Sequence, residues 1–283
     1  KDLPVRAAPR VCEGCGCPVE AHEVLAVTES EARILEVARR ACAPFELSVC
    51  IRQSVQDTSN LGFWRDNFTY GEVNLLSFLR LLDRVRSYRT TVTGSVTMAG
   101  KAFYDLGSGV GKCVVAAALH PICFSRCVGV ELLPGLHAIS RIIAGRFNAE
   151  AASAAEACGA LPSETIFLEE DLFEMRLTDA CFVLLNAGSW REPHLSRLRD
   201  YLVKALPDGC LLGTIRQNLT KTGCDELVLV EELRLPMSWG VAPVFLAECR
   251  RGTACRSGPL GLGFERVLPG PSLQAPLDLM AMD

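Results

Sequence analysis

The sequence predicts an α/β fold in which a doubly wound, mainly parallel sheet carries helices on both faces and ends in an antiparallel hairpin. The first observation behind this is an alternation, from residue 101 onward, of short apolar runs with helical segments, which is typical of strands buried on both faces. The second is a set of three alternate glycines directly after the first run. The third is a pair of successive apolar runs near 226–235 and 241–248, separated by turn residues, which indicates a terminal hairpin.

A small, mainly helical region, residues 1–69, precedes the sheet. Thr28 followed by Glu31 predicts a capping box, and the apolar residues of the next turns share one helical face. A mixed stretch then leads to Tyr70-Gly71-Glu72. Leucines at positions 75, 76, 79 and 82 predict a second helix, which we expect to end before a Thr/Gly-rich linker at 90–100.

The sheet domain spans 70–251. Its strand candidates are Ala102–Leu106, Cys127–Glu131, Thr165–Leu168, Cys181–Asn186 and Cys210–Ile215. An Ala-rich helix over 136–158 ends before Gly159 and Pro162. The remaining residues, 252–283, are rich in glycine and proline and predict a loop or a disordered tail.

Composition sets limits on the function. The 283 residues are 49% hydrophobic and 22% charged, which is ordinary for a globular protein. A net charge of -4 excludes a global positive field that would attract nucleic acid without specificity. We see neither a membrane-spanning run nor a signal peptide, and the 14 cysteines are too few for a disulfide scaffold, so we expect an intracellular protein with reduced thiols. The chain begins at Lys1, and we therefore expect it to be a fragment or a processed product.

The segment from Asp105 to Lys112, with Gly107, Gly109 and Gly111 at alternate positions, is the most informative motif. Glycines between a strand and a helix let backbone approach a ligand closely. A dinucleotide-binding fingerprint would read G-x-G-x-x-G, whereas here the third glycine comes one position early. This spacing resembles the D-x-G-x-G-x-G loop of Rossmann-like methyltransferases, which bind S-adenosylmethionine.

Two further acidic positions follow at successive strand ends. Glu131 ends the next strand, where a carboxylate can accept hydrogen bonds from both ribose hydroxyls. Asp171 follows the third strand, where it can accept the adenine amino proton while Leu172 covers the ring. The simpler alternatives are a solvated strand end for Glu131 and an exposed acidic face for Asp171.

The order and spacing of these motifs resemble the disruptor-of-telomeric-silencing family of non-SET histone lysine methyltransferases over about residues 60–250. The residues that carry the resemblance are Tyr70-Gly71-Glu72, Asp105 to Gly111, Val128 to Glu131, Asp171, Asn186 and Ser238-Trp239. The resemblance implies a Rossmann-like class I methyltransferase sheet in a nuclear protein. It also implies methyl transfer from S-adenosylmethionine to a lysine on the histone H3 core within the nucleosome.

The resemblance also assigns site residues. Those implied to bind the cofactor are Tyr70, Gly71, Glu72, Val73, Asp105, Leu106, Gly107, Ser108, Gly109, Val110, Gly111, Lys112, Glu131, Asp171 and Leu172. Asn186 is implied at the mouth of the lysine channel, where its carboxamide oxygen would orient the amine, and Trp239 as an aromatic channel wall. The alternatives are core packing for Tyr70, a helix cap for Asn186 and hairpin packing for Trp239.

The sequence also departs from the family pattern. Val73 and Lys112 replace uncharged polar residues, Leu172 replaces an aromatic residue, and Ala187 replaces a second asparagine. A channel tyrosine is replaced near Leu246, and Trp64 or Phe68 is a candidate substitute. Without a strongly basic segment, DNA contact is left to local groups such as Arg250, Arg251 and Arg256.

Other functions remain open. A methyltransferase for another acceptor is one, although Asn186-Ala187-Gly188-Ser189 differs from the N-P-P-Y of amino-directed enzymes, and only Glu192 is near for the glutamate pair of arginine enzymes. A non-catalytic chromatin subunit that binds S-adenosylmethionine is another. Cys12, Cys15, Cys17 and His22, aided by Cys42 or Cys50, are possible zinc ligands, but without a second C-x-x-C we expect no metal.

Overall fold

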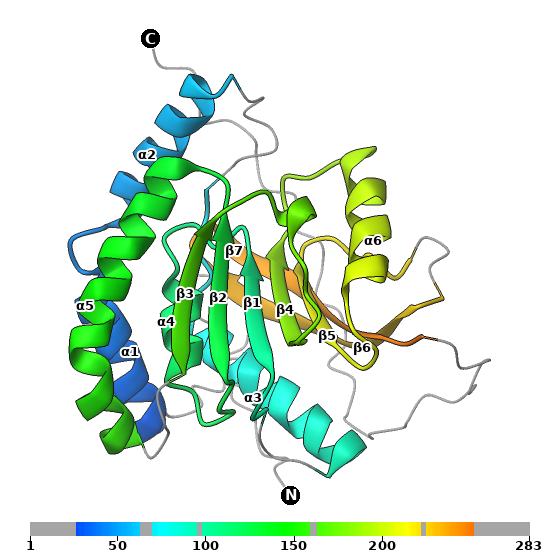
Figure 1. The fold of residues 1–283 in the computed structure, drawn as a ribbon, viewed down its shortest axis with the longest axis horizontal. Helices are drawn as coiled ribbons and strands as arrows, with labels where there is room; N and C mark the ends of the chain where they lie inside the picture. The colour runs from blue at the N-terminus through cyan, green and yellow to red at the C-terminus, as the bar shows by residue number, and fades with distance from the viewer. Residues whose placement is uncertain (1–26, 63–69, 95–97, 159–162, 222–224, 252–283) are drawn as a thin grey trace, which may run out of the picture. The chain divides into compact units, whose positions relative to one another are not determined.

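The computed structural model describes residues 27–62, 70–94, 98–158, 163–221 and 225–251, with the backbone alone for 152–158. These residues form a seven-stranded sheet in the order β3-β2-β1-β4-β5-β7-β6. The first five strands are parallel, and β7 lies antiparallel between β5 and β6 (Figure 1). This topology confirms the Rossmann-like class I methyltransferase sheet and its terminal antiparallel hairpin. The strands are β1 (Ala102–Leu106), β2 (Arg126–Glu131), β3 (Glu164–Glu169), β4 (Ala180–Asn186), β5 (Leu211–Ile215), β6 (Leu227–Met237) and β7 (Gly240–Cys249).

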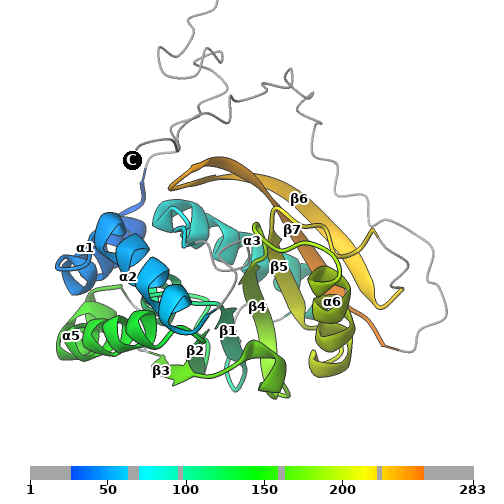
Figure 2. The ribbon, with the colours of Figure 1, turned by 90° about the horizontal axis from the view of Figure 1, so that it is seen from above.

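Two apolar clusters cover the two faces of the sheet, and Figure 2 shows helices on both sides of it. Helices α1 (Glu29–Cys42), α3 (Leu75–Thr93), α4 (Lys112–Ala118) and α5 (Pro134–Cys158) contribute to the first cluster. Helix α6 (His194–Ala205) contributes to the second through Leu198 and Leu202. Alternate residues of β1 supply the two clusters, with Phe103 on one face and Tyr104 on the other, so both faces are buried as the apolar runs predicted.

The N-terminal capping box is confirmed. Thr28 Oγ1 accepts a hydrogen bond from the Glu31 backbone N–H at 3.1 Å, and Glu31 Oε2 accepts one from the Thr28 N–H at 2.7 Å. The mixed stretch that follows contains a helix that the pattern did not predict, α2 (Leu47–Asn60). Its Asp57 is buried, and Oδ2 accepts hydrogen bonds from the backbone N–H groups of Gly135 (2.9 Å) and Leu136 (3.2 Å). Helix α2 therefore caps the start of α5.

The predicted linker at 90–100 is corrected at its start. Helix α3 continues to Thr93 and ends at Gly94, whose φ of 72° is left-handed. Threonine hydroxyls within the last turns donate to carbonyls one turn back, Thr90 to Arg86 at 2.9 Å and Thr93 to Arg89 at 2.8 Å. These bonds let a Thr-rich segment remain helical.

The cysteines predicted in apolar runs are buried and free, as expected of reduced thiols: Cys113, Cys127, Cys181 and Cys210. Among the described helices, none has both the length and the apolar character needed to cross a bilayer.

Candidate functional site

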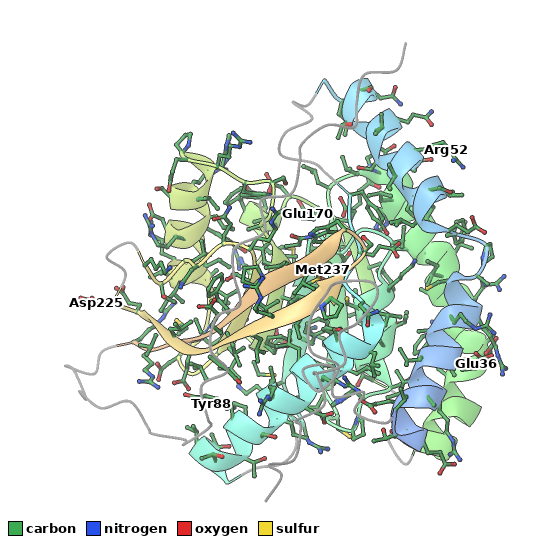
Figure 3. The ribbon with its side chains drawn as sticks, turned by 180° about the vertical axis from the view of Figure 1, so that it is seen from behind. Glu36, Arg52, Tyr88, Glu170, Asp225 and Met237 are labelled. Atoms are coloured by element: carbon green, nitrogen blue, oxygen red, sulfur yellow. The ribbon has the colours of Figure 1, made fainter. Side chains whose placement is uncertain are left out.

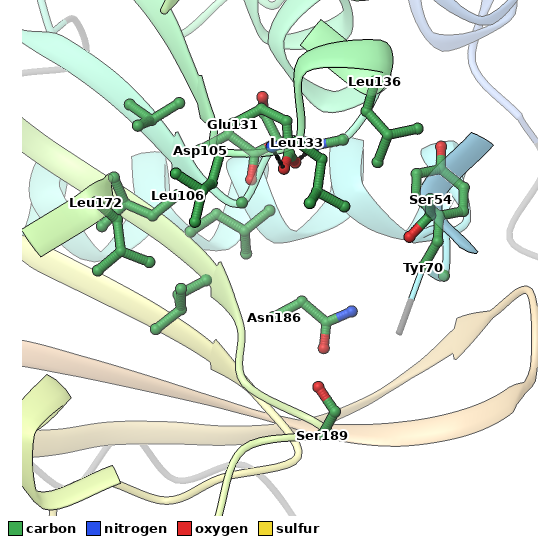
Figure 4. Close-up of a pocket in the computed structure, with 18 of the residues that line it drawn as sticks. Ser54, Tyr70, Asp105, Leu106, Glu131, Leu133, Leu136, Leu172, Asn186 and Ser189 are labelled. Atoms are coloured by element: carbon green, nitrogen blue, oxygen red, sulfur yellow. Dashed lines mark hydrogen bonds between the residues drawn. The ribbon is translucent and has the colours of Figure 1, made fainter. Parts of the chain in front are cut away.

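A cavity of about 620 Å³ opens at the carboxyl ends of β1, β2 and β4 (Figure 4). Ligands of open α/β sheets bind at this end of the strands. The predicted site residues that line it are Tyr70, Gly71, Glu72, Val73, Asp105, Leu106, Gly107, Ser108, Gly109, Lys112, Glu131, Asp171, Leu172 and Asn186. The structure therefore brings together segments that are far apart in the chain.

Three predicted residues lie elsewhere. Val110 is buried in the core, and Gly111 is the N-cap of α4, packed against Phe167. Trp239 occupies the turn between β6 and β7, where its side chain is 40% exposed and its ring covers Gly71. Leu246, at the position expected for a channel tyrosine, is fully buried in the core.

The glycine loop needs glycines for its backbone. Gly107, Gly109 and Gly111 have φ values of 79°, 56° and 82°, in the left-handed region. Gly109 has a further constraint, because a Cβ there would lie 2.7 Å from Cε2 of Tyr70. Ser108 Oγ is buried and has no hydrogen-bond partner among the described residues. The loop therefore presents bare backbone and one unsatisfied hydroxyl beside the cavity.

Two buried carboxylates face this loop. Glu131 Oε2 accepts a hydrogen bond from the Gly109 backbone N–H at 2.7 Å, and Oε1 accepts one from the Leu133 N–H at 2.9 Å. Burial raises the pKa of Glu131 above its usual range, although these backbone donors oppose the shift. Burial, together with the nearby Glu131 carboxylate, raises the pKa of Asp105 to about 7. No donor among the described residues satisfies Asp105, so a ligand with a donor group would relieve its buried charge.

At the opposite end of the cavity, the Glu72 carboxylate accepts hydrogen bonds from Tyr70 Oη at 2.9 Å and from Lys112 Nζ at 2.7 Å. The Glu72 and Lys112 side chains are only 18% and 19% exposed. Burial and the adjacent Glu72 charge raise the pKa of Tyr70, so its hydroxyl remains a donor at neutral pH. The departure at Lys112 therefore places a cation beside Glu72, where the resemblance implied an uncharged polar residue.

Asn186 projects into the cavity from the end of β4 (Figure 4). Its Oδ1 accepts a hydrogen bond from the Gly188 backbone N–H at 3.2 Å, and its amide nitrogen is turned toward Tyr70. Helix α6 starts only at His194, so Asn186 closes a local turn and does not cap that helix. Ser189 lies beside Asn186, with its hydroxyl pointing toward the carboxamide (Figure 4).

Asp171 has a local partner. Its Oδ1 accepts a hydrogen bond from the Phe173 backbone N–H at 3.0 Å and caps the 3₁₀ turn Leu172–Glu174. The exposed acidic neighbours Glu169 and Glu170 flank it in sequence (Figure 3 labels Glu170). Leu172 lines the cavity as predicted.

The sequence analysis missed an aromatic wall next to Leu172. Phe173 and Trp190 both line the cavity, with ring centroids 6.0 Å apart, and the Arg197 guanidinium lies 3.9 Å from the centroid of Phe173. The signal for Phe173 was its place directly after Asp171-Leu172. No spacing motif marks Trp190, which lies in the connection between β4 and α6, or Arg197, which lies on α6. Ser54 of α2 and Cys113 of α4 also line the cavity.

The remaining predicted residues are easily placed. Arg250 donates to Glu248 Oε2 at 2.6 Å, and Arg251 donates to carbonyls at the end of α6. Burial raises the pKa of the Cys42 thiol to about 11, and no group of metal-ligating side chains occurs within the described ranges. Cys12, Cys15, Cys17, His22, Trp64, Phe68 and Arg256 lie outside the described residues.

Comparison with known proteins gives one family. Residues 65–216 match the family model of histone methylation protein DOT1. No curated protein matches. Solved structures with a related fold include an RNA methyltransferase from Salinibacter ruber in complex with S-adenosyl-L-homocysteine (23% identity, TM-score 0.40, 62% of this chain and 94% of that one). Another is magnesium protoporphyrin IX methyltransferase from Synechocystis PCC 6803 with bound S-adenosylmethionine (13% identity, TM-score 0.45, 70% and 95%).

Proposed function

Because the chain belongs to the DOT1 family of histone methylation proteins, we propose that it is a nuclear protein-lysine N-methyltransferase. Its methyl donor would be S-adenosylmethionine, and its acceptor a lysine on the histone H3 core within the nucleosome. The observation that carries the proposal is one cavity lined by the glycine loop, Glu131, the Glu72–Lys112 pair and Asn186.

The cavity fits the donor at its adenosine end. Glu131 has one backbone donor on each carboxylate oxygen, which leaves further lone pairs for ribose hydroxyls. Ser108 Oγ is a buried polar atom without a partner among the described residues, and Asp105 beside it is a buried carboxylate whose pKa is raised by burial and by Glu131, as a ligand-binding loop would leave them. Leu172 and Phe173 provide apolar surface for the adenine ring.

The cavity also fits the amino-acid end. That end carries an ammonium and a carboxylate, and Glu72 and Lys112 offer the complementary charges. We propose that the internal pair opens on binding, so that Glu72 binds the ammonium and Lys112 the carboxylate. Lys112 would then supply a charged contact in place of the uncharged polar one expected at this position.

Methyl transfer requires that the donor methyl group and the acceptor amine be aligned, and that the amine be uncharged. S-adenosylmethionine supplies a methyl group on a sulfonium, which is an excellent leaving group. Leu184, Leu185 and Ile215 line the cavity next to Asn186, and apolar surroundings favour the uncharged form of an entering lysine. Asn186 would contact the amine, either through its cavity-facing amide or through the remaining lone pair of Oδ1. No general base is required.

The test is transfer of radiolabelled methyl from S-adenosylmethionine to whole nucleosomes, free histone octamers and naked DNA in parallel. We expect label on nucleosomes above all, with mass spectrometry placing it on a lysine of the H3 core. Label on DNA or on another protein would contradict the proposed acceptor and leave the donor intact. Binding of S-adenosylhomocysteine without transfer to any acceptor would favour a non-catalytic chromatin subunit.

A further inference from the structure

The Tyr70–Val73 segment is held in place by the turn between β6 and β7. The Glu72 backbone N–H donates to Ser238 Oγ at 3.0 Å, and the Ser238 N–H donates back to the Glu72 carbonyl at 2.8 Å. Val73 forms an isolated antiparallel bridge with Met237, which Figure 3 labels at the end of β6. The segment is thus attached to the hairpin like a short extra strand.

Trp239 adds a side-chain contact to these backbone bonds. Its ring covers Gly71 so closely that a Cβ on Gly71 would overlap Cζ3 and Cε3 of the indole. This contact requires glycine for space alone, since Gly71 is not among the glycines with positive φ. The ring therefore limits how closely the Tyr70–Val73 segment can approach the hairpin.

The segment held in this way carries the charged end of the cavity. The Tyr70 ring packs over Gly109, its hydroxyl donates to Glu72 at 2.9 Å, and Lys112 donates to the same carboxylate at 2.7 Å. Ser238 holds the Glu72 backbone through a hydrogen bond, and Trp239 covers the preceding residue, Gly71. The position of the Glu72 carboxylate therefore depends on both. Neither Ser238 nor Trp239 lines the cavity.

We propose that Ser238 and Trp239 are positioning residues that set the affinity for the amino-acid end of the donor, through the Tyr70–Glu72 segment. This inference rests on the proposed function, because it takes S-adenosylmethionine as the ligand. It gives Trp239 a role other than an acceptor-channel wall. A positioning role of this kind affects one end of the ligand and leaves the adenosine end, bound by Glu131 and its neighbours, unchanged.

The test compares two ligands by calorimetry. S-adenosylhomocysteine carries the amino-acid end, and 5′-methylthioadenosine has the same adenosine and thioether but no amino or carboxyl group. We expect Trp239→Ala to weaken S-adenosylhomocysteine about tenfold, the value of one hydrogen bond to a charged group, and to leave 5′-methylthioadenosine within about twofold. Trp239→Phe, which keeps a ring over Gly71, should restore most of the affinity.

Two further variants make the test specific. Val241→Ala alters an exposed side chain of the same hairpin (59% exposed) that lines no cavity, and should change neither affinity. Ser238→Ala removes the acceptor of the Glu72 N–H and should repeat the selective loss, even if Trp239→Ala fails to fold. Circular dichroism melts confirm that each variant is folded.

The outcomes separate the two proposals. Equal weakening of both ligands by Ser238→Ala and Trp239→Ala, or unchanged affinity for both, would overturn the positioning role while the proposed function stood. Failure of the wild-type protein to bind either ligand would overturn the donor assignment, and the positioning role with it. Selective loss for S-adenosylhomocysteine would support both.

Discussion

Glu131 Oε2 accepts a hydrogen bond from the backbone N–H of Gly109 at 2.7 Å, across a sequence separation of 22 residues. The bond joins the end of β2 to the loop that follows β1. Glu131 therefore holds the glycine loop, and its carboxylate keeps further lone pairs for the proposed ribose contact.

The first prediction concerns this carboxylate. Glu131→Ala removes the acceptor for two backbone donors and the proposed ribose contact, so S-adenosylhomocysteine binding should weaken by about 1.5–3 kcal/mol. Isothermal titration calorimetry measures the loss. Glu169→Ala is the matched control, because Glu169 is the exposed carboxylate paired with Glu131 on the neighbouring strand. Unchanged affinity in Glu131→Ala would remove Glu131 from the site.

The second prediction concerns the pH dependence of stability. The Asp105 pKa is raised from 3.8 to about 7, so the folded protein holds a proton that the unfolded chain has lost between these values. Through Asp105, the free energy of unfolding of the protein therefore falls as pH rises from about 4 to about 7, and it stays at the lower value above pH 7. Asp105→Asn cannot ionise. It should be more stable than wild type at pH 8 by up to about 4 kcal/mol, at about 1.4 kcal/mol per pKa unit.

Urea denaturation at pH 5 and pH 8 checks this, without ligand. The advantage of Asp105→Asn should grow between the two pH values, and a constant difference would contradict the raised pKa. We expect the same variant to bind S-adenosylhomocysteine more weakly, since an amide accepts hydrogen bonds less strongly than a carboxylate.

The third prediction separates backbone strain from steric overlap in the glycine loop. At Gly107 a Cβ would meet nothing within 4 Å, whereas at Gly109 it would lie 2.7 Å from the Tyr70 ring. Gly107→Ala should cost about 1 kcal/mol for its left-handed backbone alone, and Gly109→Ala about 1–3 kcal/mol more. Thermal unfolding measures both. Adding Tyr70→Ala should relieve Gly109→Ala and not Gly107→Ala, and equal behaviour of the two would refute the contact.

The fourth prediction concerns the charged pair. Lys112→Met would leave the poorly exposed Glu72 carboxylate with Tyr70 as its remaining donor and should destabilise the protein by about 1–3 kcal/mol. Lys112→Gln keeps a hydrogen-bond donor and should lose less stability. Denaturant titration tests this order. Equal losses would contradict this order and show that a neutral donor does not replace the lysine ammonium in holding Glu72.

The fifth prediction concerns turnover. Asn186 lines the cavity. If it contacts the acceptor amine as proposed, Asn186→Ala should reduce kcat by about 100-fold or more, and the affinity for S-adenosylhomocysteine by less than about threefold. Single-turnover transfer to nucleosomes gives the rate, and calorimetry the affinity. Comparable losses in both would assign Asn186 to donor binding. Ser189→Ala, which alters the lining residue beside Asn186, tests whether the effect is specific to the carboxamide.

The strands and the glycine loop were predictable because their signals are local. A buried parallel strand needs a short apolar run, and a left-handed backbone needs glycine, as at Gly107 and Gly109. Helix α2 was missed because Leu47–Asn60 carries mostly polar side chains on its surface and because its N-cap residue, Glu46, makes no side-chain capping bond. Its buried polar residues, which include Ser54 and Asp57, are explained only by their tertiary surroundings, since Asp57 bonds the start of α5 and Ser54 lines the cavity.

The parts of the site that escaped prediction depend on tertiary contacts. Phe173, Trp190 and Arg197 come together because the β3 and β4 connections lie side by side, and no spacing in the chain encodes this. Trp239 was predicted as a channel wall, whereas its contact with Gly71 arises from pairing between segments more than 160 residues apart, as the Glu72–Ser238 bond shows.

The attachment of the Tyr70 segment to the β6–β7 turn has a consequence for synthesis on the ribosome. The described residues that line the cavity have all been translated by Ile215, yet the β6–β7 turn that bonds the Glu72 backbone follows more than 20 residues later. The chain emerges in order from its N-terminus, so a nascent protein stalled after β5 has these lining residues but lacks the hairpin that holds the Glu72 backbone. The ability to bind the ligand should therefore appear late, once β7 has left the exit tunnel and has inserted between β5 and β6.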